Sequence, residues 1–133
     1  MKKPAKLRFG CFCFTKVVLA ICALMFAGCS SNDFKVVDAL HTGMTREEAK
    51  ATIQSYGFRL EESFSRPADG WPRERKTFTA TEWRAGREEE RVGKHVMSVE
   101  LYPVGHGLLG AGLLFLFYGE DGSLMNFYRY QVN

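Results

Sequence analysis

The stretch Ala111-Gly112-Leu113-Leu114-Phe115-Leu116-Phe117-Tyr118 decides the fold, because it is continuously apolar. Such a run predicts a central strand that is buried on both faces or nearly so. Downstream, Glu120-Asp121-Gly122 predicts a tight turn, and Ser123 to Val132 predicts a returning last strand. Upstream, Val96 to Tyr102 alternates between apolar and polar residues and predicts a neighbouring strand. These segments together predict an antiparallel meander.

The segments before the meander are more polar. Thr77 to Trp83 is rich in β-forming residues and predicts a further strand, with Arg73-Glu74-Arg75-Lys76 as its charged flank. Glu88-Glu89-Glu90-Arg91 predicts a solvated hairpin tip, although the charges of either run could also pair with a partner or with lipid headgroups. Arg66 to Pro72 is a loop by its Pro and Gly content, and Phe58 to Ser65 is ambiguous. No helical pattern is expected between the strands.

Helices are expected only before these strands. Phe34 to Leu40 predicts a short first helix, because its apolar residues lie about one turn apart. A second helix is predicted over residues 45–56, where Thr45 and Glu48 fit a capping box and Gly57 ends the helix. The residues of this helix-start motif are Gly43, Met44, Thr45 and Glu48. Two helices followed by a meander indicate the α+β class.

The N-terminal region has the layout of a secretory signal peptide. Residues 1–28 contain five basic residues and no Asp or Glu, and Val17 to Phe26 carries no charge. This apolar run is well short of the ~20 residues that span a bilayer as a helix. We therefore expect an export signal over residues 1–28 and no permanent transmembrane anchor.

The end of this signal indicates its type. Phe26-Ala27-Gly28-Cys29 resembles the lipobox of bacterial lipoproteins, in which small residues precede the cysteine that becomes the mature N-terminus. The resemblance implies cleavage between Gly28 and Cys29 and lipidation of the Cys29 thiol. The alternatives are an ordinary signal peptide with a chance cysteine, or use of Cys22, which Ile21 disfavours because a branched residue would occupy the small-residue pocket.

The mature chain is then one small domain on a lipidated tether. Residues 29–33 form the tether and residues 34–133 the domain, which is too small for a two-domain enzyme. Ser30 stands where an Asp would retain a lipoprotein at the inner membrane in enterobacteria-like sorting. It therefore favours the periplasmic face of the outer membrane.

Cysteine count and charge limit the partners of the mature chain. Three of the four cysteines lie in the segment that is removed: Cys11, Cys13 and Cys22. The remaining Cys29 excludes disulfides and cysteine metal sites from the mature domain. Removing the five basic residues of the signal from the total of 18 leaves 13 basic against 15 acidic residues, a net charge of −2. The overall basic balance therefore gives no argument for nucleic-acid binding.

Four features in order resemble the BamE-like (SmpA/OmlA) outer-membrane lipoproteins. They are the lipobox cysteine, the helix start over residues 43–48, the glycine that ends this helix, and a terminal hairpin with Asp-Gly in its turn. The resemblance implies two N-terminal helices packed on a three- or four-stranded antiparallel sheet. It also implies a scaffolding role, in assembly of outer-membrane β-barrels or in envelope integrity. The wider superfamily includes β-lactamase-inhibitor-like domains, which bind other proteins.

Gly105-His106-Gly107-Leu108-Leu109-Gly110 matches the spacing of a dinucleotide-binding loop. That site needs a following helix whose N-terminus meets the pyrophosphate, whereas an apolar strand follows here. We therefore expect a flexible inter-strand loop. His106, Leu108 and Leu109 are its candidates for contact with a partner or a membrane.

Catalytic and metal sites have no support from spacing. His41, His95 and His106 are widely separated, so they do not form a metal-ligand motif, and no nucleophile elbow or zinc-protease helix is present. We expect no enzyme activity, no metal and no cofactor. The strand aromatics Phe115, Phe117, Phe127, Tyr128 and Tyr130 are expected mostly in the core, and any that face outward would form a protein-binding patch.

These observations predict a lipid-anchored, non-catalytic envelope lipoprotein. Its expected partners are the membrane, through the N-terminal lipid, and other envelope proteins, with no nucleic acid and no small-molecule substrate. The alternative is a periplasmic protein inhibitor of a hydrolase or lysozyme, which would insert a loop such as residues 103–110.

Overall fold

The computed structural model describes residues 32–75, 79–107 and 110–132. Four antiparallel strands form one sheet in the order β1-β2-β3-β4. The strands are β1 Glu62–Ser65, β2 Ser98–Gly107, β3 Gly110–Tyr118 and β4 Leu124–Val132. β3 lies between β2 and β4, and every residue from Leu114 to Tyr118 is buried. The prediction of a central strand buried on both faces is confirmed.

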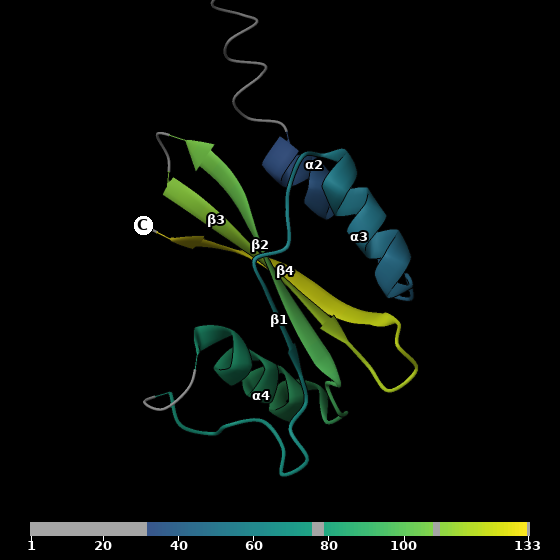
Figure 1. Cartoon of the computed structure of the whole chain (residues 1–133), viewed down its shortest axis with the longest axis vertical. Helices are drawn as coiled ribbons and strands as arrows, with labels where there is room; N and C mark the ends of the chain where they lie inside the picture. Colours follow the sequence, from purple (N-terminus) through teal and green to yellow (C-terminus); the bar gives the residue numbers. More distant parts are fainter. Residues whose placement is uncertain (1–31, 76–78, 108–109, 133) are drawn as a thin grey trace, which may run out of the picture. The chain divides into compact units, whose positions relative to one another are not determined.

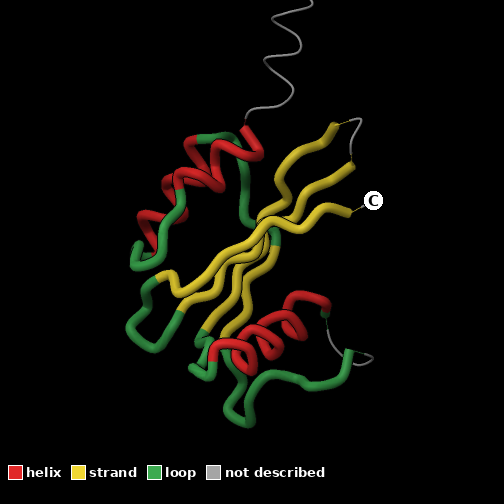
Figure 2. The backbone as a smooth tube through the Cα atoms, turned by 180° about the vertical axis from the view of Figure 1, so that it is seen from behind, coloured by secondary structure: helices red, strands yellow, loops and turns green. Residues whose placement is uncertain are grey.

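Each face of the sheet packs against its own helices. Alternate residues of a strand point to opposite faces, so Leu114 and Leu116 belong to one face and Phe115 and Phe117 to the other. We call these the first and the second face. Helices α2 (Asn32–Ala39) and α3 (Arg46–Ser55) cover the first face, and α4 (Ala80–Val92) covers the second, as Figures 1 and 2 show. The sheet therefore has an apolar core on each side.

The two N-terminal helices form as predicted. α2 contributes Val36 to the first core, and α3 contributes Ala49 and Ile53, one helical turn apart. The capping box of α3 is present: Thr45 Oγ1 accepts from the Glu48 amide at 3.1 Å, and Glu48 Oε2 accepts from the Thr45 amide at 2.9 Å. The α+β class, with two N-terminal helices on an antiparallel sheet, is confirmed, and the sheet has four strands.

The helix-start motif also connects α3 to the sheet. Met44 is buried in the first core. The Gly43 amide donates to the Leu124 carbonyl at 2.8 Å, and the Leu124 amide donates to the Met44 carbonyl at 2.8 Å. Gly43 and Gly57 both adopt positive φ, of +92° and +87°, so glycine is required at both ends of this helical segment. The motif is therefore structural.

Two predictions were wrong over the described residues: the strand over Thr77 to Trp83, of which residues 77 and 78 lie outside the description, and the hairpin tip over Glu88 to Arg91. Residues 80–92 form helix α4, and Glu88 to Arg91 belong to it instead of to a hairpin tip. α4 begins with a second capping box, between Thr79 and Glu82, and ends at Gly93 in the left-handed conformation. Its buried residues are Thr81, Ala85 and Glu88. Because two of these three are polar, the helical spacing is not visible as an apolar stripe.

The glycine-rich segment is less of a loop than predicted. β2 continues to Gly107 and β3 begins at Gly110, so residues 105–107 are strand residues. The pairing is irregular between Val104 and His106, where Gly105 has a φ of +80°. The ambiguous segment contains the short edge strand β1. The predicted tight turn after β3 is confirmed, with Gly122 at a φ of +78°.

We expect Thr79→Ala to lower the free energy of unfolding by about 1 kcal/mol, because the N-terminal amides of α4 lose their side-chain acceptor. Urea denaturation followed by circular dichroism measures this loss. Thr42→Ala is the matched control, since Thr42 is an exposed turn residue outside the helices, and we expect it to stay within about 0.5 kcal/mol of the parent. Equal losses in the two variants would contradict the role of Thr79.

Candidate functional site

The sequence-predicted site residues are not gathered at one place. Gly28, Cys29, Leu108 and Leu109 lie outside the described residues, and His106 is described only by its backbone in β2. Thr45 and Glu48, with their neighbours in the helix-start motif, form the cap of α3. The polar chemistry of the domain lies elsewhere, in a buried cluster, a partly buried cluster and a groove.

The first cluster surrounds Glu100, a buried residue on the first face. Its Oε1 lies 3.2 Å from Arg46 Nε, and its Oε2 accepts from the hydroxyls of Tyr102 at 3.0 Å and Tyr118 at 3.2 Å. The Arg46 guanidinium also lies over the Tyr118 ring, 4.8 Å from its centroid, and donates to Ser98 Oγ. Burial, and then the charge of Glu100, raise the pKa of both tyrosines well above the ordinary range. The cluster therefore joins α3 to the sheet through neutral phenols.

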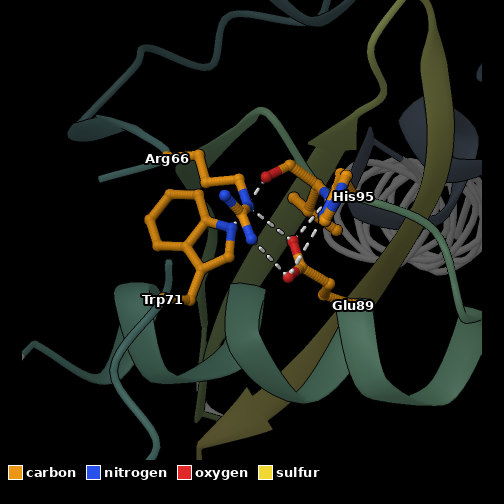
Figure 3. Close-up of polar contacts among 5 residues, drawn as sticks. Arg66, Trp71, Glu89 and His95 are labelled. Carbon is orange, nitrogen blue, oxygen red and sulfur yellow. Dashed lines mark hydrogen bonds and ion pairs between the residues drawn. The ribbon is translucent and has the colours of Figure 1, made fainter. Parts of the chain in front are cut away.

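The second cluster surrounds Glu89 of α4 (Figure 3). Arg66, in the loop after β1, donates to both carboxylate oxygens at 2.9 Å, and the Val96 amide donates at 3.0 Å. His95 Nδ1 lies 3.5 Å from Oε1, and the Trp71 indole donates to the Val96 carbonyl at 2.7 Å. The hydrogen bond from Arg66, supported by those from Val96 and His95, lowers the pKa of Glu89 to about 2. This cluster connects α4, the loop after β1 and the start of β2.

A groove lies between α4 and β4. It is an open hollow of about 500 Å³. Its lining residues come from two segments far apart in the sequence: Arg84, Arg87, Glu88, Arg91, Asn126, Phe127 and Tyr128. The three arginines lie on one side of α4 because they are three and four residues apart. We call this hollow the α4–β4 groove.

Two of the three groove arginines have carboxylate partners. Arg91 donates to both oxygens of the buried Glu88, at 2.6 and 3.1 Å, and Asn126 Nδ2 donates to the same carboxylate at 2.6 Å. Burial alone would raise the pKa of Glu88, but the hydrogen bonds from Arg91 and Asn126 outweigh it and the pKa lies below its ordinary range. Arg87 pairs with Glu90 at 2.9 Å, and both side chains are exposed.

Arg84 differs from Arg87 and Arg91 in its partners, which are aromatic residues instead of carboxylates. Its Nη1 donates to the Tyr128 hydroxyl at 3.0 Å, and its guanidinium lies 4.8 Å from the Phe115 ring centroid and 4.4 Å from that of Tyr130. In the described part of the chain, no carboxylate lies within 4 Å of this guanidinium. Aromatic faces stabilise the cation and hold it in place, but they do not neutralise its charge. The groove therefore contains a positioned guanidinium that can accept an anionic partner.

The histidines remain apart. His41 and His95 are exposed, and they lie in different parts of the fold. Within residues 32–75, 79–107 and 110–132, no three His, Cys, Asp or Glu side chains gather in a way that could hold a metal ion. In the same residues, no helix has the length and apolar character needed to cross a membrane.

The groove is not apparent from the sequence for an identifiable reason. A hairpin tip over Glu88 to Arg91 would separate these residues from Arg84, whereas in α4 the side chains of Arg84, Arg87 and Arg91 share one helix face. The available signal was Thr79-Ala80-Thr81-Glu82, which repeats the capping pattern of Thr45-Arg46-Glu47-Glu48. The prediction for the aromatics was confirmed in part: Phe115 and Phe117 are core residues, whereas Tyr130 is 45% exposed.

Comparisons with protein-family models, with curated proteins and with solved structures gave no match to this chain. No relative therefore supplies a role for any residue of the groove. Its function has to follow from its own contacts and charges.

The stability of the domain should depend on the ionisation of Glu89. The pKa of Glu89 is lower in the folded state than in the unfolded state. Its contribution to the free energy of unfolding is therefore fully present above the ordinary pKa of 4.5 and is lost as the pH falls toward about 2. One pKa unit corresponds to about 1.4 kcal/mol, and this conversion is reduced here because Arg66 and Glu89 are each about one-fifth exposed. We therefore expect Glu89→Gln to lower the free energy of unfolding by about 2–3 kcal/mol at pH 7.

Urea denaturation at several pH values tests this expectation. The difference between the parent and Glu89→Gln should shrink as the pH is lowered from 5 toward 2. Glu90→Gln is the matched control, because Glu90 is a neighbouring carboxylate that pairs only at the surface. A difference for Glu89→Gln that does not change with pH would contradict the role of the Arg66–Glu89 ion pair.

Proposed function

We propose that this chain is a lipid-anchored bacterial envelope lipoprotein that acts without catalysis, as a scaffold or assembly factor that binds other envelope proteins. The binding role is supported by the environment of Arg84. Its guanidinium is held in an open groove by aromatic residues and has no carboxylate partner in the described chain. Charged groups that complement a partner give specificity and fast association. The proposed location is the periplasmic face of the outer membrane.

The buried carboxylates support binding over catalysis. Glu100 is held by Arg46 and two tyrosine hydroxyls, and Glu88 by Arg91 and Asn126. A general acid or base must reach a substrate proton from an accessible position. Carboxylates that are committed to neighbouring donors serve the packing of helices on the sheet.

The lipid anchor is supported by the sequence around Cys29. The last two residues of the predicted tether, Asn32 and Asp33, already belong to α2, so the remaining tether is short and the domain would stay near the membrane surface. Such a tether raises the effective concentration of the domain toward membrane partners. The resemblance to BamE-like lipoproteins favours the same role, but here α4 covers the second face, so the proposed partner surface is the α4–β4 groove.

Cys29→Ala tests the anchor. We expect the parent to carry acyl mass and to fractionate with the outer membrane, whereas the variant lacks the lipid or fails to mature. Membrane fractionation and intact mass measure both properties. Equal solubility and the same cleavage site in the two proteins would exclude the lipid anchor.

A photoreactive amino acid at position 87 tests the binding role in intact cells, because Arg87 lines the groove and its side chain is 63% exposed. We expect crosslinks to defined envelope proteins, and we expect Cys29→Ala to reduce them by removing the tether. Position 59 is the control, since Arg59 is exposed outside the groove. The same crosslinks from both positions would contradict a partner surface at the groove.

A further inference from the structure

The outer side of the edge strand β4 lacks a partner strand in the described part of the chain. β4 is the last strand in the sheet order, and β3 pairs with one side of it. On the other side, residues 43–45 contact Ser123 and Leu124 at the start of the strand. From Met125 to Tyr130, no backbone hydrogen bond to a described residue outside β3 is present. Alternate residues of an antiparallel strand direct their N–H and C=O groups outward. This part of β4 can therefore pair with another strand.

The edge also lacks the usual protection against pairing. Edge strands are commonly blocked by proline, by lysine or by a charged side chain that points into the pairing surface. Residues 125–130 contain no Pro or Lys, and their one charged residue is Arg129. Its side chain is 13% exposed and turns onto the first face, 3.6 Å from Asp33 and over the Phe34 ring. Arg129 is thus directed at α2 and leaves the edge open.

The α4–β4 groove lies directly along this edge. Asn126, Phe127 and Tyr128 belong both to the open stretch of β4 and to the groove lining. α4 runs antiparallel to β4 here, because Arg84 contacts Tyr128 and Tyr130 while Glu88 contacts Asn126. A strand added to β4 would therefore lie beside the arginine-bearing face of α4.

The spacing of the arginines suits the side chains of such a strand. Residues 84 to 91 extend about 10 Å along the helix axis at 1.5 Å per residue. Three alternate residues of a strand extend about 13 Å and point to the same face. Acidic side chains at alternate positions would meet the guanidiniums, of which Arg84 has no carboxylate partner in the described chain.

We propose that the α4–β4 groove binds an extended segment of a partner protein by strand addition to residues 125–130, with acidic side chains at alternate positions facing Arg84, Arg87 and Arg91. Main-chain hydrogen bonds give the affinity in this mode of recognition, and the side chains give specificity. The inference rests on the proposed protein-binding role and names the chemistry of the partner segment.

A synthetic peptide tests the proposal with the full chain, purified as the producing cell matures it. The probe alternates Glu and Val over nine residues, the length of β4, and carries a fluorophore. Two matched peptides replace Glu by Lys, or carry N-methyl groups that remove alternate backbone donors. We expect each to bind at least about tenfold more weakly than the probe, because charged and main-chain hydrogen bonds are lost. Amide hydrogen exchange at Phe127 to Arg129 should slow only with the probe.

Variants of the chain measure the contribution of the groove arginines to peptide binding separately from that of the β4 edge. Arg84→Met keeps an apolar stem on the rings but removes the guanidinium, so we expect about tenfold weaker binding of the probe. Arg87→Met serves as a second variant that does not touch the core, since its side chain is exposed. Arg59→Met, which removes the same charge outside the groove, should leave binding unchanged.

Several results would overturn the proposal. Equal binding of the Glu and Lys peptides would exclude recognition of acidic side chains by Arg84, Arg87 and Arg91. Equal binding of the probe and the N-methylated peptide would exclude strand addition. Binding of phosphatidylglycerol vesicles that depends on Arg84, without binding of the probe, would assign the groove to lipid headgroups. Self-association that protects Phe127 to Arg129 would assign the edge to a second copy. If envelope proteins still crosslink at position 87 while the probe does not bind, the binding role stands and strand addition fails.

Discussion

Burial of β3 on both faces is the constraint on which the rest of the structure depends. Its apolar run projects Leu114 and Leu116 to one face and Phe115 and Phe117 to the other, so a helix layer on a single side would leave large apolar side chains in water. α2 and α3 cover the first face, and α4 covers the second. The packing of α4 on the second face is therefore a consequence of the composition of β3.

Carboxylates that are buried or partly buried hold these helices in place. α4 buries only one apolar side chain of its own, Ala85, so apolar packing of the helix itself contributes little. Trp71 adds apolar area from the preceding loop, and Glu88 and Glu89 connect α4 to β4 and to Arg66. Removing one partner of a buried pair leaves an uncompensated charge, which is strongly destabilising. The polar residues of α4 thus specify its position on the sheet.

The same arrangement determines which surface remains for a partner. Both faces of the sheet are covered, the short strand β1 forms one edge beside residues 98–101 of β2, and residues 43–45 cover only the start of β4 at the other edge. Among the described residues, the outer edge of β4 is open after its first residue and has the arginines of α4 alongside it. With the proposed tether near a membrane, such a surface would be suited to capturing extended segments of neighbouring proteins. The proposed role as an envelope scaffold and the proposed acidic strand therefore concern one surface.

The sequence by itself determined the elements whose signals are local. The apolar run of β3, the Asp121-Gly122 turn and the Thr45–Glu48 capping box each depend on neighbouring residues, and each was predicted correctly. α4 was mistaken for a strand and a hairpin tip, because the residues that it buries include Thr81 and Glu88, which give no apolar period. Only the tertiary structure decided the α4–β4 groove. Glu88 and Asn126 are 38 residues apart, and their contact exists because covering the second face of the sheet brings α4 beside β4.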